Sequence, residues 1–187
     1  MKEKLKNMLS EERWRHSVNS SKIAYELALK HGVNPKKAEI AGLLHDCAKD
    51  MEFEKLKKMV LKYNIKTNFD IDKIPKLLHS FVGEFVAREE FNIQDLEILQ
   101  AIRMHSTGGY RMTVLDKIVY LSDKIEPLRK YEGVTKIRKM ADKDINQAML
   151  LVLNEGLISL IERGLMINPA TIEARNDILN KVVFQNA

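Results

Sequence analysis

Apolar residues recur along most of the chain at intervals of three and four, the spacing of an amphipathic α-helix, and short polar breaks separate these stretches. A first helix is predicted to begin after the capping residue Ser10 and to run to about Lys30. Asn34 and Pro35 restart the chain as a capping residue and a first-turn proline, and the helix they begin is predicted to end near Lys49. Two helices therefore fill the N-terminal part of the chain.

The helical pattern continues toward the C-terminus. Thr113 and Asp116 have the form of a capping box that opens a helix, which Pro127 ends. Residues 64–75 carry no helical stripe and are predicted to be a loop. Further helices are expected at residues 53–63, 76–90, 95–105, 134–141, 145–163 and from 168 onward.

Signals for β-structure are absent from the sequence: no hairpin dipeptide separates alternating runs, and no β-rich segment has turns on both sides. We therefore predict an all-α fold, a helical bundle that forms a single domain over residues 1–187. Its core is expected at about residues 10–130, with the helices of residues 131–187 packed on it.

The composition, 45% apolar and 30% charged, is that of a globular protein. The longest uninterrupted apolar stretch, Ala148–Leu153, is far too short to span a bilayer, and the charged N-terminus lacks the apolar core of a secretory signal. Cys47 is the single cysteine and cannot form an internal disulfide. We therefore expect a soluble protein in a reducing, cytoplasmic setting.

The net charge of +5 favours an anionic partner, although the lysines are spread along the chain as on solvated helix faces. A phosphorylated small molecule explains this charge as well as nucleic acid does. We expect neither nucleic acid nor a membrane as a partner. The sequence leaves the oligomeric state open, with a homodimer among the alternatives.

Four of the five histidines fall on the faces of predicted helices that carry core residues or sit in a motif. His16 shares a stripe with apolar residues, His45 is followed directly by an aspartate, and His79 and His105 lie on small or apolar faces. Asp123 stands within a mostly apolar helix. Buried polar groups need partners, and a metal ion would satisfy several of them together. Imidazole and carboxylate ligands suit iron, manganese, zinc or cobalt.

Each of these features has a simpler explanation when it is taken alone. About 0.3 adjacent His-Asp pairs are expected by chance in a chain of this composition. One inward histidine is more often a hydrogen-bonded core residue, and a buried aspartate can pair with lysine or arginine. The combination of four histidines from separate helices with the embedded Asp123 favours a metal site. His31, at the end of the first helix, is interpreted as structural.

The order His16, His45-Asp46 and Asp123 resembles the H…HD…D motif of HD-domain phosphohydrolases. The chain is most similar to their YqeK branch, the symmetrical bis(5′-nucleosyl)-tetraphosphatases, which split diadenosine tetraphosphate into two ADP. The resemblance covers nearly the whole chain, and it rests on the segments HSVNSSKIAYELA, AGLLHDCAKDM, LLHSFVGEFVAREEF, AIRMHSTGG, MTVLDKIVYLSDKIEPLRKYEGV and TIEARN.

The resemblance implies an iron cofactor, ferrous or ferric, with manganese, cobalt or magnesium as substitutes. The implied metal ligands are His16, His45, Asp46 and Asp123. The implied catalytic residues are Asp46, Lys49, His79 and His105. The residues expected near a dinucleoside polyphosphate, or an ADP- or GDP-like nucleotide, are His16, Asp46, Cys47, Ala48, Lys49, His79, His105, Ser106, Thr107, Asp123, Arg129, Thr171 and Arg175. The C-terminal helices are thus expected to contribute to the nucleotide site.

The chain departs from the family pattern at two places. Cys47 stands where an aromatic residue is expected, and Asn168-Pro169 replaces a His-Pro pair before TIEARN. Neither place holds a metal ligand, so the departures concern nucleotide contacts. Two alternatives stay open: another HD-type hydrolase, acting on nucleoside monophosphates or guanosine polyphosphates, or a metal-dependent nucleotide-binding regulator with little turnover. Whether His79 and His105 hold a second metal or contact phosphate is also open.

Overall fold

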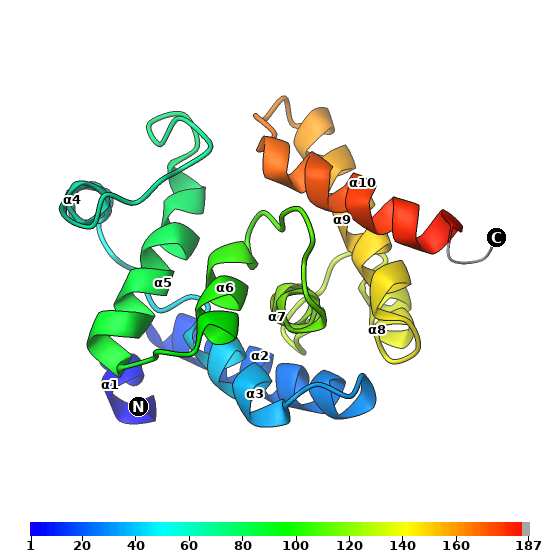
Figure 1. Cartoon of the computed structure of the whole chain (residues 1–187), viewed down its shortest axis with the longest axis horizontal. Helices are drawn as coiled ribbons and strands as arrows, with labels where there is room; N and C mark the ends of the chain where they lie inside the picture. The colour runs from blue at the N-terminus through cyan, green and yellow to red at the C-terminus, as the bar shows by residue number, and fades with distance from the viewer. Residues whose placement is uncertain (185–187) are drawn as a thin grey trace.

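This computed structural model describes residues 1–184 of the chain. The regular secondary structure in this range consists of helices, which loops and turns connect (Figure 1). Within that range there is no strand, which confirms the predicted all-α fold. The elements are α1 (Lys2–Lys6), α2 (Glu11–Lys30), α3 (Pro35–Leu44), α4 (Phe53–Lys62), the 3₁₀ turn η1 (Pro75–Leu77), α5 (Leu78–Phe91), α6 (Leu96–Met104), α7 (Val114–Ile125), α8 (Val134–Ala141), α9 (Ile145–Glu162) and α10 (Pro169–Phe184).

The predicted helix starts are mostly confirmed by capping bonds. The Asn34 side chain accepts hydrogen bonds from two backbone amides at the start of α3, and Thr113 and Asp116 form the predicted capping box of α7. Ser10 does lie at the N-cap of α2, but its side chain makes no capping bond. Its backbone N–H instead donates to Asp50 Oδ2 at 2.7 Å. This bond ties the start of α2 to the segment after α3.

The second helix ends earlier than predicted, at Leu44 and not near Lys49. From there to Met51 the backbone turns more tightly, with bonds to the carbonyl three residues back from Cys47, Lys49 and Met51. The side chains of the neighbours His45 and Asp46 nevertheless approach each other, with His45 Nε2 3.7 Å from Asp46 Oδ2.

The helix α1 has no counterpart in the sequence prediction. It is five residues long, too short for a periodic stripe to be recognised, and only Leu5 is buried on it. Leu5 is fully buried in the core. One well-placed leucine therefore anchors this short helix.

The centre of the molecule is α7, around which the other helices are arranged (Figure 1). Ten of its twelve residues are buried, and it packs against α2, α3, α6, α8 and α9. The helices α2 and α3 pack closely on each other below it, and α5 and α6 form a second pair. Inward side chains of α2, α5, α6 and α7 therefore converge in one region.

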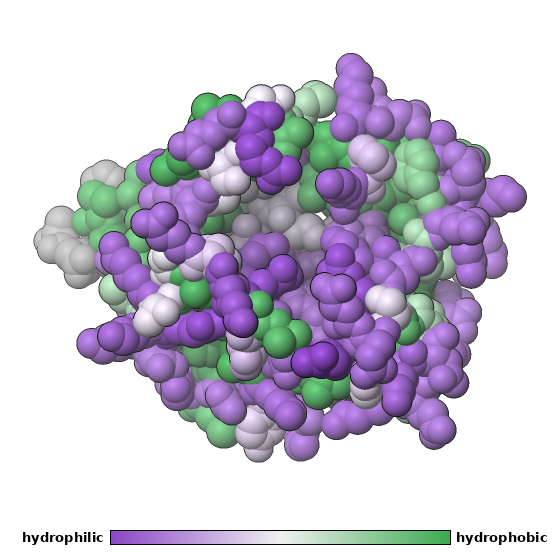
Figure 2. Space-filling view, turned by 180° about the vertical axis from the view of Figure 1, so that it is seen from behind, coloured by the Kyte–Doolittle hydropathy of each residue, from purple (hydrophilic) through white to green (hydrophobic). Residues whose placement is uncertain are grey.

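The helices α8, α9 and α10 pack on one side of this core. The helix α9 is long and apolar enough to cross a membrane by length and composition alone, and 28% of it is buried. Its inner face, with Ala148, Met149 and Leu153, belongs to the hydrophobic core, as expected of a core helix. On the face turned away from the view of Figure 1, the surface is hollowed between the α9–α10 side and the α4–α5 side (Figure 2).

Candidate active site

The structure brings all the predicted metal-ligating residues into one buried cluster. Each of these residues is at most 5% exposed. His16 comes from α2, His79 from α5 and Asp123 from α7, while His45 and His105 lie at the C-terminal ends of α3 and α6. Together with Asp46, these residues form the cluster that we call the His/Asp centre.

One half of the His/Asp centre is built from His16, His45 and Asp123. The Nε2 atoms of His16 and His45 are 3.1 Å apart, and His16 Nε2 lies 3.0 Å from Asp123 Oδ1. His45 Nε2 is 4.0 Å from the same carboxylate oxygen. The three ligand atoms lie within 4.8 Å of one another, a spacing that can hold a metal ion.

The other half is built from His79 and His105, and Asp46 joins the two halves. The Nε2 atoms of His79 and His105 are 3.1 Å apart and lie 3.1 and 3.4 Å from Asp46 Oδ1. The other oxygen of the same carboxylate, Oδ2, lies 3.7 Å from His45 Nε2 and 3.9 Å from His16 Nε2. Asp46 thus presents one oxygen to each half.

Each imidazole is oriented by a hydrogen bond from its outer nitrogen, Nδ1. His45, His79 and His105 donate to the backbone carbonyls three residues before them, at 2.7 to 2.8 Å. His16 Nδ1 faces Glu126 Oε1 at 3.2 Å. Because all four partners are acceptors, Nδ1 carries the hydrogen and Nε2 presents a lone pair to the centre. Metal-binding histidines show the same outer contacts.

The Nε2 lone pairs and the carboxylate oxygens of the His/Asp centre face one another, so their chemistry shows whether these residues fit a metal. Lone pairs of paired Nε2 atoms face each other at 3.1 Å and also face carboxylate oxygens, which accept hydrogen bonds and do not donate them. Such a set repels itself unless a cation lies among the atoms. The donor types, imidazole nitrogen and carboxylate oxygen, match those of divalent transition metals. The His/Asp centre therefore fits a metal.

The pKa values of the residues in the His/Asp centre are shifted by burial and by the neighbouring groups. Burial lowers the pKa of His45 to about 4 and also lowers the pKa values of His79 and His105. Burial raises the pKa of Asp46, but the adjoining histidines, His45 first among them, outweigh burial and hold that pKa well below its usual value. Asp123 is likewise held low, against burial, chiefly by Lys124 and His16. The carboxylates are ionised and these three imidazoles are neutral, as metal ligands need to be.

Four cationic side chains surround the two carboxylates. Lys124 Nζ lies 2.8 Å from Asp123 Oδ2, and Arg129 Nη2 lies 2.6 Å from Asp123 Oδ1. On Asp46, Arg13 Nη1 is 3.4 Å from Oδ2. Lys49 Nζ is 4.0 Å from Oδ1 of Asp46 and 3.2 Å from His79 Nε2. The surroundings of the His/Asp centre thus offer several positive charges to an anionic ligand.

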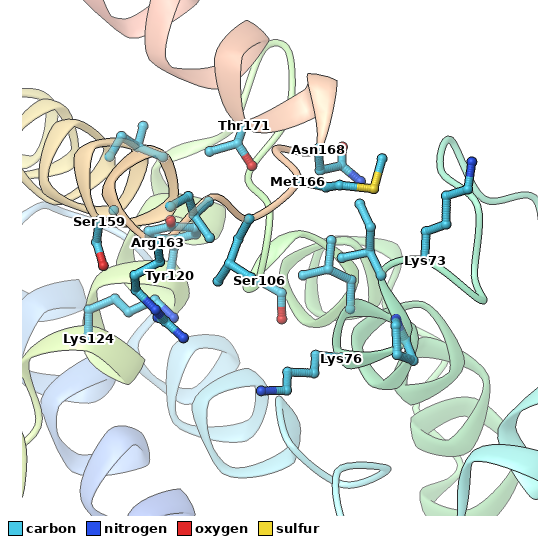
Figure 3. A pocket seen from close by; sticks show the side chains of 17 residues that line it. Lys73, Lys76, Ser106, Tyr120, Lys124, Ser159, Arg163, Met166, Asn168 and Thr171 are labelled. Carbon is cyan, nitrogen blue, oxygen red and sulfur yellow. The ribbon is translucent and has the colours of Figure 1, made fainter.

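A cavity of about 490 Å³, the large cavity, opens beside the His79 and His105 half. Its wall combines residues 73–77, the helix α7, the C-terminal part of α9 and the start of α10 (Figure 3). Ser106 reaches into it, and its Oγ lies 3.2 Å from His79 Nε2 and 3.1 Å from His105 Nε2. Lys124 and Arg163 line one side. The volume suits a nucleoside-sized ligand.

The remaining predicted substrate contacts are distributed unevenly. Thr171 lines the large cavity with Ser106, whereas Thr107 lines a separate cavity of about 460 Å³ that Phe81 and Met104 also border. The Cys47 side chain is buried with its Sγ 3.5 Å from the Gly83 carbonyl, and its neighbour Ala48 is fully buried. Arg175 Nε donates to Asn154 Oδ1 of α9 at 3.1 Å.

Asn168 stands at one of the two positions where the chain departs from the family pattern. Its Oδ1 accepts from the backbone N–H of Ala170, and so caps α10. The side-chain amides of Asn68 and Asn168 also exchange two hydrogen bonds of 3.3 Å. This amide pair joins the loop before η1 to the start of α10 at the edge of the large cavity.

Sequence reasoning missed Arg13, Lys124 and Glu126 at this site. Arg13 lies one turn before His16 on α2, and Lys124 directly follows Asp123. Glu126 is 1% exposed and supports His16. Their proximity in sequence to the ligands was an available signal. Isolated charged residues next to a motif are, however, more often solvated.

Comparison with known proteins identifies the family of this chain. The family model described as HD domain matches residues 13–128, more than half of the chain and the segment that supplies every residue of the His/Asp centre. The chain belongs to the HD domain family. A divalent metal is implied by this membership, and the His/Asp centre is able to bind one.

Two curated proteins and one solved structure are similar to this HD-domain chain over more than nine tenths of its length. The symmetrical bis(5′-nucleosyl)-tetraphosphatase of Bacillus subtilis (strain 168) is 36% identical, covering 92% of this chain and 92% of its own. The one from Halalkalibacterium halodurans is 34% identical, covering 94% and 93%. The crystal structure of a predicted HD superfamily hydrolase involved in NAD metabolism, from Clostridium acetobutylicum, superposes with a TM-score of 0.93 at 36% identity, covering 96% and 95%.

Proposed function

We propose that this HD-domain protein hydrolyses diadenosine tetraphosphate symmetrically, giving two ADP. The observation that carries the proposal is the joining of a metal-fitting His/Asp centre to a nucleoside-sized cavity with basic walls. The two tetraphosphatases that are 34–36% identical over more than nine tenths of the chain support it. The reaction needs both parts, because it is a phosphoryl transfer to water on a nucleotide.

We assign the metal ligands to His16, His45, Asp46 and Asp123, with iron as the ion and manganese, cobalt or magnesium as substitutes. A bound divalent metal would polarise a phosphoryl oxygen and lower the pKa of water. For His79 and His105 we propose a second metal position in preference to a direct phosphate contact. Their Nε2 atoms present lone pairs, and so they serve as ligands more readily than as proton donors.

The remaining residues bind and orient the polyphosphate. Lys49, 28% exposed and beside Asp46 and His79, is placed to neutralise a phosphate oxygen as a point charge. Ser106 can donate its hydroxyl hydrogen to a phosphate at the cavity side of the centre. Water attacks the β-phosphorus of the ADP nearest the large cavity, the bond to the bridging oxygen breaks, and that oxygen leaves with the second ADP.

The nucleoside of the retained ADP occupies the large cavity. Arg163 and Thr171 line it, which supports a contribution of the helices of residues 131–187 to the site. The last three residues of that range lie outside the described part of the chain. Thr107, Arg175, Cys47 and Ala48 remain predictions, since none of them lines the large cavity.

We further infer a cytoplasmic setting and a dinucleoside polyphosphate as the partner, without nucleic acid or membrane. Cys47, the single cysteine, is buried and its pKa is raised by burial, so its thiol is protected from oxidation. A homodimer stays a prediction that sedimentation of the purified protein tests.

Product analysis tests the proposed function. The purified protein is incubated with iron, manganese or cobalt and with diadenosine tetraphosphate, nucleoside monophosphates and guanosine polyphosphates in turn. Diadenosine tetraphosphate should give ADP alone, with one ¹⁸O atom from labelled water on one of the two ADP molecules per turnover. Equal amounts of AMP and ATP would refute symmetrical cleavage. Nucleotide binding without turnover would favour the regulator.

A further inference from the structure

The His/Asp centre has a second opening, at its His16 end, that is much smaller than the large cavity. This small pocket has a volume of about 100 Å³ and is lined by Glu12, Arg13, His16, Glu126, Leu128 and Arg129. The large cavity, by contrast, reaches the centre through Ser106, at the His79 and His105 half. Small-molecule sites commonly measure roughly 300–1,000 Å³. The small pocket can hold phosphate groups but cannot enclose a nucleoside.

Two guanidinium groups border the small pocket on either side of His16. Arg13 Nη1 lies 3.4 Å from Asp46 Oδ2, and Arg129 Nη2 lies 2.6 Å from Asp123 Oδ1. Each arginine side chain is 36% exposed, so both touch the centre and solvent at once. A guanidinium presents several donors in a plane that matches phosphate oxygens. The pair is therefore placed to bind phosphates that extend outward from the centre.

The carboxylates of the small pocket do not oppose this use. Glu126 is 1% exposed and is engaged by the His16 imidazole, by Asn19 Nδ2 at 3.2 Å and by the backbone N–H of Leu128 at 2.8 Å. Its Oε1 also lies 3.8 Å from Arg129 Nε, so the groups around Glu126, Arg129 included, offset its charge. Glu12 is exposed at the edge, where solvent screens it.

The position of Arg129 is fixed from a neighbouring helix. Arg138 of α8 donates to the backbone carbonyls of Ile125, Glu126 and Arg129, at 2.7 to 3.0 Å. These bonds hold the segment after α7 against the core. The backbone that carries Arg129 is therefore held in place by hydrogen bonds, as a phosphate-binding residue requires.

We propose that Arg13 and Arg129 form a pyrophosphate subsite, which holds the departing half of the substrate by its two phosphates alone. This inference rests on the proposed function. It adds an activity: a nucleoside 5′-tetraphosphate, which has no second nucleoside, is also a substrate. Water adds to the β-phosphorus, the bond to the oxygen bridging the β- and γ-phosphorus breaks, that oxygen leaves with pyrophosphate, and the released proton goes to solvent. Adenosine 5′-tetraphosphate then gives ADP and pyrophosphate.

The experiment compares the wild type, Arg13→Gln and Arg15→Gln, all loaded with metal. Arg15 lies on the same turn of α2 but is exposed and lines neither opening, so its variant controls for loss of charge. Hydrolysis of adenosine 5′-tetraphosphate and of diadenosine tetraphosphate is followed by chromatography. Binding of inorganic pyrophosphate is measured by calorimetry, with the metal content determined after each titration.

We expect the wild type to release ADP and pyrophosphate from adenosine 5′-tetraphosphate. Arg13→Gln should lower kcat/KM for both substrates, and the affinity for pyrophosphate, by about tenfold or more, with unchanged metal content. Arg15→Gln should stay within about twofold of the wild type.

Two results would overturn the subsite. One is a wild type that makes ADP from diadenosine tetraphosphate but no pyrophosphate from the shorter compound, which leaves the proposed function intact. The other is an Arg13→Gln protein that binds pyrophosphate as Arg15→Gln does. If the wild type cleaves neither compound, the proposed function fails, and the pyrophosphate titration still decides whether the subsite exists.

Discussion

At the scale of single residues, Asp46 has the most demanding position, because its two carboxylate oxygens serve different halves of the His/Asp centre. The change Asp46→Asn replaces one oxygen by an amide nitrogen, which donates hydrogen bonds and does not ligate metal. We expect metal content to fall below about a tenth of the wild-type value, with loss of turnover. Elemental analysis of the purified proteins measures this.

The matched control for that change is Asp142→Asn. Asp142 pairs with Lys30 on the surface, and its side chain is 53% exposed. This variant should keep its metal. An Asp46→Asn protein with full metal content would show that the carboxylate is not a ligand.

The buried histidines make the stability of the metal-free protein depend on pH. Burial lowers the pKa of His45 to about 4 and also lowers those of His79 and His105, whereas the unfolded chain has the ordinary value of 6.5. As the pH falls below 6.5, the unfolded state therefore binds protons that the folded state does not. The pKa of His16 is raised, because Asp123 outweighs burial, so His16 acts in the opposite direction.

Three lowered pKa values outweigh one raised value, so the free energy of unfolding should decrease as the pH falls from about 6.5 toward 4. Each histidine with a lowered pKa contributes up to about 1.4 kcal/mol per pH unit. Urea denaturation of chelator-treated protein at about pH 7 and about pH 5 measures the change. Equal or greater stability at the lower pH would contradict the neutral state assigned to these imidazoles.

The histidines and aspartates of the centre could be found in the sequence because they combine motif spacing with inward-facing positions. Arg13 stands close to His16 in the sequence, but that position alone does not distinguish it from a solvated residue, because its role depends on where α2 meets the turn that carries Asp46. The same holds for Lys124, whose sequence context reads as an ordinary charged residue near a helix end. Charged groups at a site are recognised only after the fold has brought them together.

At the scale of elements, two glycines lead to opposite expectations. Gly108, between α6 and α7, has φ +67°, and a Cβ added there would lie 2.8 Å from the Ala174 Cβ of α10. Gly156 is inside α9, and an added Cβ would meet nothing within 4 Å. Gly108→Ala should therefore destabilise the protein by about 1–3 kcal/mol, through backbone strain and the clash with α10.

Gly156→Ala serves as the matched control and should stabilise the metal-free protein by about 0.5–1 kcal/mol, because alanine is the better helix former. Chemical denaturation of both variants measures the two effects. Equal stability of the two would refute the tight approach of α10 to the turn that contains Gly108.

Helix positions were predictable where capping residues and apolar stripes agree, as at Asn34 and Thr113. The end of α3 was not, because no glycine or proline directly follows Leu44 to mark it, although the backbone there turns more tightly. The short α1 was missed for another reason. It depends on the burial of Leu5 against the core and not on its own pattern.

At the scale of the whole molecule, the large cavity joins segments that are distant in the chain, from residue 73 in the loop before α5 to Thr171 in α10. The Asn68–Asn168 amide pair is a direct bond between those sides. A ligand in the cavity therefore contacts both sides of the molecule and should resist their separation. That such a cavity forms could not be deduced from periodicity, which assigns helices but not the gap between them.

We expect ADP at about one hundred times its dissociation constant to stabilise the metal-loaded protein by about 2.7 kcal/mol. For a chain of this length that corresponds to a rise in Tm of roughly 5–10 °C. Thermal unfolding with and without ADP measures it, and adenosine without phosphates is the control, which should give a smaller shift. No shift with ADP would exclude the cavity as its site.

His45 and Asp46 are neighbours in the chain, so a single peptide unit connects ligands to both halves of the centre. The spacing between those halves is consequently set in part by covalent bonds, whose lengths hardly change with temperature or helix movement. His16, His79 and Asp123 come from three different helices, so only the link between His45 and Asp46 ties the two halves together within one short segment.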